Sequence, residues 1–336
     1  MDFGRDFTTW RCGANFIPST AVNQLEMWQE ATFDPETIRR ELVWAASLGM
    51  RVMRVYLHDL PYAEDAAGFL RRIEAYLAIA GGSKIRTVFV FFDDCWKGEF
   101  RLGPQPAPVP RQHNSGWVQS PGRRAADDPA EWGRLEAYVT GVMRHFAHDR
   151  RILAWDLYNE PGNGPAGDHD TISGCRGKAS LPLLNAVFDW AEAAGAEQPY
   201  TSGIWTLSPE YDELNRTALE RSQVVSFHSY APPEGLAERA DFLRFLAAGR
   251  PVMCTEYMAR GRGSTFASCL PLLKEKNVTA IHWGLVAGKT NTIYPWGWKA
   301  EDGEPEQWFH DVFHADGRML YEAERAVFEE VCQPNS

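Results

Sequence analysis

The sequence predicts an α/β protein made of one (β/α)8 TIM barrel. Short apolar segments rich in Val, Ile and aromatic residues alternate eight times with longer segments of helical periodicity. Most of the short segments are continuous apolar runs, as expected for parallel strands that are covered on both faces. The chain has 336 residues, of which 44% are hydrophobic. We therefore expect a single catalytic domain that spans residues 1–336.

The expected strands are six or seven residues long, within the usual length of a buried strand. They are Arg11–Ile17, Arg51–Leu57, Arg86–Phe92, Ile152–Tyr158, Tyr200–Trp205, Val224–Tyr230, Val252–Tyr257 and Ala280–Leu285.

Helix start signals precede the apolar stripes between these strands. Asp34-Pro35 supplies an N-cap and a first-turn proline, and Gly49 closes that helix. Asp128-Pro129 repeats the signal before a stripe from Trp132 to Phe146. Further helices are expected near Glu64–Ile79, Leu181–Ala194, Leu236–Ala247, Thr265–Lys274 and Leu320–Val331.

The segments that follow strands are longer than those that return from helices. Cys95–Asp127, Pro161–Ser180 and Val286–Pro305 are the longest. Active sites of TIM barrels lie at the C-terminal ends of the strands, where such segments begin. We therefore expect the Pro-rich stretch Gly103–Pro110 to be a wall of the cleft.

Composition excludes several classes of partner. The formal net charge is −11 without a cluster of Lys and Arg, which argues against nucleic acid and anionic membranes as partners. Thirteen Trp residues suit a sugar-binding cleft, although most large aromatic residues are buried in cores. A carbohydrate is the partner we expect.

The six cysteines are scattered, without a metal-ligand spacing, so no metal and no cofactor is expected. Cys12 and Cys254 fall in expected strands, where free thiols act as small apolar residues. Neither a signal peptide nor an apolar run of membrane-spanning length is visible. These features favour a cytoplasmic protein, or a periplasmic or secreted one if a signal had been removed.

Two glutamates end expected strands on the same face of the barrel. Glu160 follows Asn159 and precedes Pro161 at the end of the fourth strand, and Glu256 ends the seventh. A lone carboxylate at the end of a core strand is costly unless it has a partner or a purpose. Two carboxyls roughly 5–5.5 Å apart hydrolyse glycosides with retention, whereas a wider spacing gives inversion.

This pattern resembles the glycoside hydrolases with catalytic glutamates on strands four and seven, and among them glycoside hydrolase family 5, the cellulase and mannanase family. The resemblance covers nearly the whole barrel. It implies a retaining glycosidase with Glu160 as general acid/base and Glu256 as nucleophile. The positions that match supporting residues of the family are Arg54, Asn159, His228, Tyr230 and Trp283.

The roles implied for these residues follow their charges. Arg54 and Tyr230 should keep Glu256 ionised. His228 should orient Glu160, whose pKa should be raised so that it can protonate the leaving group. Asn159 would bind the 2-hydroxyl of the sugar, and Trp283 would form the floor beneath it.

The sequence departs from the family after the third strand. Many members carry a His there, whereas this chain has Asp93 and Asp94. The two acids could bind hydroxyls of a terminal sugar, or one could cap the next turn. His58 after the second strand is a similar candidate, and Trp205 and Trp296 are candidate walls of the cleft.

The function that these residues predict is a retaining glycosidase acting on a β-linked or furanosidic glycan. We expect exo action or action on short oligosaccharides, with an endo-acting glucanase, mannanase or xylanase as the alternative. A catalytically silent carbohydrate-binding barrel is the alternative from another class. A metal-dependent barrel hydrolase would need His ligands on an early strand, and Cys12–Phe16 contains none.

Overall fold

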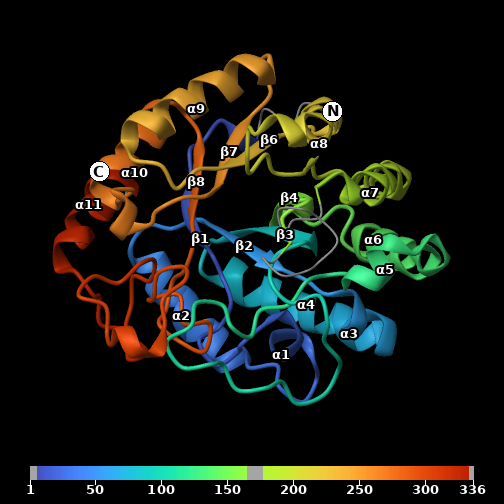
Figure 1. Cartoon of the computed structure of the whole chain (residues 1–336), viewed down its shortest axis with the longest axis horizontal. Coiled ribbons are helices and arrows are strands. Elements are labelled where there is room, and N and C mark those ends of the chain that lie inside the picture. The colour runs from blue at the N-terminus through green and yellow to red at the C-terminus, as the bar shows by residue number, and fades with distance from the viewer. Residues whose placement is uncertain (1–5, 165–176, 333–336) are drawn as a thin grey trace.

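A computed structural model describes residues 6–164 and 177–332. Its sheet has eight parallel strands in the order β5-β4-β3-β2-β1-β8-β7-β6, and it curls into the barrel at the centre of Figure 1. The predicted (β/α)8 fold is therefore confirmed. The strands are β1 Cys12–Asn15, β2 Val52–Tyr56, β3 Arg86–Asp93, β4 Ile152–Asn159, β5 Tyr200–Thr201, β6 Val225–His228, β7 Val252–Glu256 and β8 Thr279–His282.

The barrel closes between β5 and β6 with few backbone bonds. Ile204 N donates to Ser226 O at 2.9 Å, and His228 N donates to Ile204 O at 3.1 Å. The Thr201 and Ser226 hydroxyls lie 2.8 Å apart. The expected strand Tyr200–Trp205 is only two residues long as a strand, Tyr200–Thr201, and Ile204 beyond it pairs with Phe227 as an isolated bridge.

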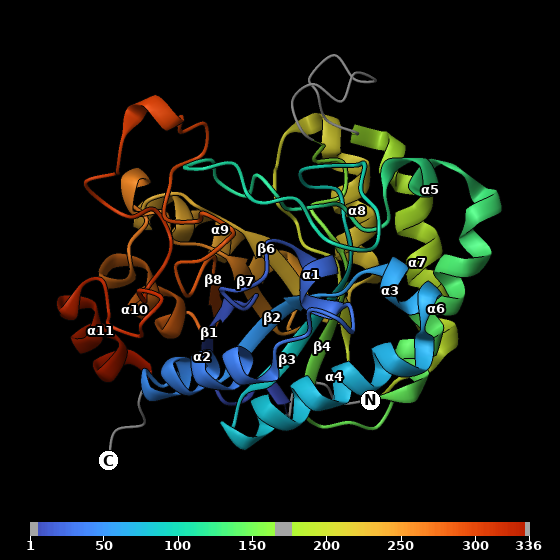
Figure 2. The same ribbon diagram turned by 90° about the horizontal axis from the view of Figure 1, so that it is seen from below.

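Helices surround the barrel (Figures 1 and 2). Asp34 accepts from Thr37 N and Pro35 is the first helical residue, as the sequence predicts. The expected helix Glu64–Ile79 is interrupted at Asp65, which caps α4 by accepting from Gly68 N. The helices are α1 Gln24–Trp28, α2 Pro35–Ser47, α3 Asp59–Glu64, α4 Ala66–Gly82, α5 Arg123–Asp127, α6 Trp132–His145, α7 Leu181–Ala194, α8 Asp212–Arg221, α9 Pro233–Ala247, α10 Phe266–Glu275 and α11 Glu322–Cys332.

The barrel interior changes from apolar to charged along the strands. Val52, Val88 and Met253 belong to a buried cluster that also includes Phe7. Alternate residues of a strand point to the same face, so Arg54 follows Val52 on the inner face of β2. Because this arginine is fully buried, the layer above the apolar cluster must contain acidic partners.

A disulfide joins Cys12 of β1 to Cys332 of α11. The expectation that Cys12 is a free thiol is therefore wrong. The sequence separation of 320 residues gave no signal of this pairing. Cys254, by contrast, is a free and buried thiol, as expected.

Two long segments meet above the barrel. Asn114 N, after β3, donates to Thr290 O at 2.8 Å, and Asn291 Nδ2 donates to Val109 O at 2.9 Å. Arg111 forms an ion pair with Glu304 at 3.0 Å. Figure 2 shows the segment after β3 running across the top of the barrel toward the segment after β8. The mouth of the barrel is thus covered on one side. No described helix is long and apolar enough to cross a membrane.

Candidate active site

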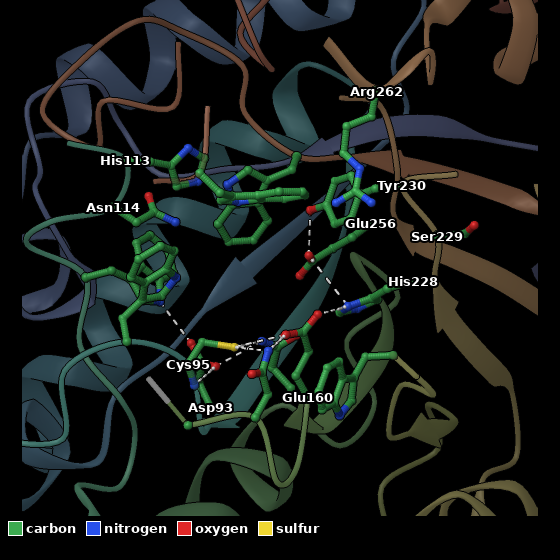
Figure 3. A pocket seen from close by; sticks show the side chains of 18 of the residues that line it. Asp93, Cys95, His113, Asn114, Glu160, His228, Ser229, Tyr230, Glu256 and Arg262 are labelled. Atoms are coloured by element: carbon green, nitrogen blue, oxygen red, sulfur yellow. Dashed lines mark hydrogen bonds and ion pairs between the residues drawn. The ribbon is translucent and has the colours of Figure 1, made fainter. Parts of the chain in front are cut away.

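A cavity of about 860 Å³ lies at the C-terminal ends of the strands. Nine of the predicted site residues line it, and Figure 3 shows several of them with their side chains directed inward. They are Asp93, Asn159, Glu160, Trp205, His228, Tyr230, Glu256, Trp283 and Trp296. Arg54 lies beneath the cavity, fully buried.

Glu256 is held by donors on both carboxyl oxygens. Oε1 accepts from Arg54 Nη1 at 3.0 Å and from Tyr56 OH at 3.1 Å. Oε2 accepts from Tyr230 OH at 2.7 Å. The side chain is 6% exposed, so these contacts are made with little screening by water. They orient the carboxylate and favour its charged form.

Arg54 connects this carboxylate to the rest of the charged layer. Its Nη2 lies 2.8 Å from Asp156 and donates to Asn159 Oδ1 at 2.6 Å. Burial by itself lowers the pKa of Arg54, but the charges of Asp156 and Glu256 and the hydrogen bond to Asp156 outweigh it and raise that pKa. The guanidinium therefore stays charged and serves as the fixed cation of the site.

Glu160 follows β4 with an unusual backbone conformation. Its φ is +43°, a left-handed value that a residue with a Cβ adopts at a cost. His228 Nδ1 lies 2.6 Å from Glu160 Oε1. Asn163 Nδ2 donates to Oε2 at 2.5 Å and Cys95 Sγ donates to the same oxygen at 3.1 Å. The strained turn thus places the carboxyl among three donors.

The two carboxyls face each other across the barrel. One oxygen of Glu160, one of Glu256 and a ring nitrogen of His228 all lie within 4.8 Å of one another. His228 Nδ1 is 3.5 Å from Glu256 Oε2, compared with 2.6 Å from Glu160. The imidazole therefore bridges the pair and is nearer to Glu160.

The pKa values of the two carboxyls are coupled. Burial raises the pKa of Glu256, and the charge of Glu160 adds to this effect. Burial acts on Glu160 in the same sense, but the hydrogen bonds from His228, Asn163 and Cys95 outweigh it and lower the pKa of Glu160. The expectation of a raised pKa for Glu160 is therefore wrong for the free site. The pair titrates as one unit, and its proton has to reside on Glu160 when a leaving group departs.

This chain resembles known proteins in its fold, although not in its sequence. No protein-family profile matches the sequence, and neither does any curated protein sequence. Among solved structures, a glycoside hydrolase of family 5, subfamily 18, from Streptomyces cattleya in complex with GlcNAc is 16% identical. The alignment covers 96% of this chain and 80% of that chain, with a TM-score of 0.67. The fold is that of the family 5 glycoside hydrolases.

Two further structures that resemble this chain differ in their named activities. The endo-1,4-β-mannanase from Rhizomucor miehei is 14% identical over 96% of this chain and 94% of that one, with a TM-score of 0.61. An exo-β-1,4-mannosidase from Opitutaceae bacterium strain TAV5 is 18% identical over 96% of this chain and 59% of that one, with a TM-score of 0.62. The shared family 5 fold therefore accommodates both endo and exo enzymes.

Two residues that were predicted to bind the sugar lie outside the cavity. Asp94 turns away from it and accepts from Gly162 N at 2.7 Å, Tyr158 OH at 2.8 Å and the Ser180 hydroxyl. His58 is buried, accepts from Leu60 N as the cap of α3, and packs against Phe100. Both satisfy neighbouring backbone and side-chain groups, which favours the capping alternative over sugar binding for these two residues.

Asp93 and Asn159 form the floor beside Glu160. Asn159 Nδ2 donates to Asp93 Oδ1 at 2.9 Å, and Trp117 Nε1 donates to Oδ2 at 2.9 Å. Burial raises the pKa of Asp93 to about 7. Both ends of the Asn159 amide are thus fixed by Arg54 and Asp93, which holds it rigidly at the edge of the cavity.

Sequence reasoning missed several residues of the site. Cys95, Trp117, Asn163 and Tyr56 contact Asp93, Glu160 or Glu256. Tyr56 lies two residues after Arg54 on β2, so the alternation of strand residues could have identified it. The other three lie in loops, where no periodicity indicates direction. The Pro-rich stretch Gly103–Pro110 does not line the cavity; the residues after it, Gln112–Ser115, do.

The Glu160, His228 and Glu256 cluster also has the composition of a metal site. Its three candidate ligand atoms lie within 4.8 Å of one another. The hydrogen bonds described above already engage both carboxyls with protein donors. We therefore treat the absence of a metal requirement as a prediction and test it below.

Proposed function

We propose that this chain is a retaining glycoside hydrolase in which Glu256 is the nucleophile and Glu160 the general acid/base. The observation that supports this most strongly is the carboxyl pair, whose oxygens come within 4.8 Å of each other. Retaining glycosidases hold their carboxyls about 5–5.5 Å apart, whereas inverting ones leave about 6.5–9.5 Å for a water.

The proposed reaction has two displacements. Glu256 attacks the anomeric carbon while Glu160 protonates the departing glycosidic oxygen, which leaves a glycosyl ester on Glu256. Glu160 then removes a proton from a water that attacks the anomeric carbon and releases Glu256. Formation of the ester removes the charge of Glu256, and this change in a coupled pair favours the deprotonated, base form of Glu160 for the second step.

The supporting residues act through the contacts described above. Arg54, Tyr56 and Tyr230 hold Glu256 for in-line attack, and His228 exchanges a proton with Glu160. Asn159 remains our candidate for the 2-hydroxyl of the sugar. Trp283 is 8% exposed and packs edge-on against Tyr56 at 5.8 Å and Trp117 at 5.5 Å. An indole held in this way can serve as a stacking platform for the sugar ring.

One side of the cavity is closed by the segments after β3 and β8, and this supports exo action. The leaving group must lie beyond Glu160, which protonates it. His113 and Asn114 lie on another side of the cavity, away from Glu160 (Figure 3). His113 Nδ1 is 2.8 Å from Tyr294 O, and Asn114 N donates to Thr290 O. These bonds between the segments after β3 and β8 form a wall that would block extension of the glycan past the cleaved sugar.

The test is a panel of aryl β-glycosides, aryl furanosides and polysaccharides. β-Mannosides come first, because mannanases and a mannosidase share the fold. Release of an aryl group, without cleavage inside polymers, is the expected result. Glu160→Gln and Glu256→Gln should each lose turnover, while Glu220→Gln on α8 serves as the charge-matched control.

Product stereochemistry then tests the mechanism. Azide should rescue Glu256→Ala and give a glycosyl azide of inverted configuration, because azide replaces the missing nucleophile. Normal turnover by Glu256→Ala would refute the assignment. Binding of sugars without turnover by the wild-type protein would instead identify a silent carbohydrate-binding barrel.

A further inference from the structure

The rim of the cavity carries cations that lack acidic partners among the residues that the structure describes. Lys97, Arg239 and Arg262 line the cavity, although the chain as a whole has a net charge of −11. Among residues 6–164 and 177–332, no carboxylate forms an ion pair with any of the three. Arg260 shows the contrast, because it lies in the same loop as Arg262 and pairs with Glu324 at 2.7 Å.

Arg239 is a half-buried guanidinium on α9. Its Nη1 donates to His228 O at 2.9 Å and to Trp205 O at 3.2 Å. In the described part of the chain, no group accepts from its Nε or Nη2. Burial lowers the pKa of this group. A partly dehydrated cation without a counterion is destabilised, and an anion in the cavity would offset that cost.

Arg262 lies on the loop after β7, on the side of the cavity away from Cys95 (Figure 3). It packs over the Trp296 ring at 5.6 Å, and Trp296 in turn packs edge-on against Tyr230 at 4.8 Å. Stacking on an aromatic ring restrains the guanidinium but leaves its N–H groups available to a ligand.

The acidic residues of the cavity do not require these cations. Asp93, Glu160 and Glu256 are the carboxylates among its described lining residues. Glu256 is paired with Arg54, Glu160 with His228, and Asp93 with the Asn159 amide and the Trp117 indole. The rim cations are thus available to neutralise a charge that residues 6–164 and 177–332 do not supply.

We infer that Arg239 and Arg262 bind an anionic group of the substrate, so that the glycan carries a carboxylate or a sulfate ester near the cleaved bond. Guanidinium forks bind both of these planar or multidentate oxyanions through paired hydrogen bonds. The inference depends on the proposed function for its substrate, a glycan, but the cationic rim itself does not depend on catalysis.

Binding is measured by calorimetry with the Glu256→Gln protein, so that turnover does not interfere. One arm uses uronic acid-containing oligosaccharides and the same oligosaccharides after carboxyl reduction. The other arm uses sulfated oligosaccharides and their desulfated forms. In one of the two arms, we expect the acidic oligosaccharide to bind at least about tenfold more tightly than its neutral counterpart. A charge-assisted hydrogen bond contributes on the order of 1.5–3 kcal/mol, and about 1.4 kcal/mol corresponds to a tenfold change in affinity.

Three second-site variants in the same protein locate the effect. Arg262→Gln should reduce the ratio of acidic to neutral affinity about tenfold, whereas Arg262→Lys should retain part of it. Arg216→Gln on α8, an exposed arginine outside the cavity, removes the same charge and should leave the ratio unchanged. Raising the salt from about 0.01 M to about 1 M should also reduce the ratio, because the Debye length falls from about 30 Å to about 3 Å.

The outcomes separate this inference from the proposed function. Equal affinities for acidic and neutral members in both arms, with hydrolysis of a neutral aryl glycoside by the wild-type protein, would overturn the inference and leave the hydrolase intact. Binding that depends on Arg262, without hydrolysis of any glycoside, would support the anion site and refute the hydrolase. An acidic preference that Arg216→Gln lowers as much as Arg262→Gln would also overturn the inference.

Discussion

Removing the Tyr230 hydroxyl isolates the support of the proposed nucleophile. Tyr230→Phe deletes the 2.7 Å hydrogen bond to Glu256 Oε2 but keeps the ring that packs against Trp296. The other close neighbour of that oxygen is His228 Nδ1 at 3.5 Å. After the substitution, Oε2 therefore has no hydrogen bond from a described residue that is shorter than 3.5 Å.

The expected loss of activity follows from the single hydrogen bond between Tyr230 and Glu256. A hydrogen bond to a charged group contributes about 1.5–3 kcal/mol, and about 1.4 kcal/mol corresponds to a tenfold change in rate. We therefore expect kcat/KM to fall about 10- to 100-fold. Since the hydrogen bond from Tyr230 lowers the pKa of Glu256, its loss should move the acidic limb of the pH profile upward.

The assay is kcat/KM across pH on the aryl glycoside found in the panel. Tyr257→Phe is the matched control, because the Tyr257 hydroxyl is buried, does not line the cavity and has no hydrogen-bond partner among the described residues. A Tyr230→Phe protein within twofold of wild type, with an unmoved acidic limb, would refute this account of the nucleophile.

Three other perturbations test separate parts of the structure. Glu41 is fully buried, and burial raises its pKa from 4.5 to about 7. Between these two pH values the folded state binds a proton that the unfolded state has lost. The free energy of unfolding should therefore fall as the pH rises from about 4.5 to about 7. Urea unfolding at about pH 4.5 and about pH 7 measures this loss of stability, and Glu41→Gln should reduce the loss by up to about 3 kcal/mol. The same pH dependence of stability in the variant and the wild type would contradict this account of Glu41. Asp94→Ala should lower both the melting temperature and kcat, because it removes the acceptor of Gly162 N near Glu160. Calorimetry and steady-state rates measure the two effects. An unchanged kcat in a folded variant would refute the idea that Asp94 positions the turn that carries Glu160. Dialysis against EDTA should leave kcat unchanged, whereas loss of activity restored by one divalent metal would show that the Glu160–His228–Glu256 cluster binds it.

The barrel could be predicted because most of its strands are continuous runs of apolar residues. Ile152–Asn159 and Val252–Glu256 were placed within one residue at each end. The short helix α8 was missed because its residues are mostly polar, and only Leu214 and Ala218 are buried. Amphipathic patterning therefore located the elements that bury a broad face and failed for those that bury little.

The site was predictable where side chains project from strand ends. Arg54, Glu160, His228 and Glu256 come from four strands or the residues directly after them, and closure of the barrel brings them together. Asp94 shows the limit. Sequence reasoning could not decide which of two adjacent acids faces the cavity, because the backbone turn after β3 fixes their directions, and that turn depends on contacts with Gly162 and Ser180.

The bond between Cys12 and Cys332 makes the protein a covalent ring through almost its whole length. A protease that cuts once in any surface loop between these residues would open the ring without producing separate fragments. The nicked barrel would run as one species on a non-reducing gel and as two after reduction. Because the pieces stay tethered, they would also remain at a high effective concentration for one another, so a single cut need not separate Glu160 from Glu256.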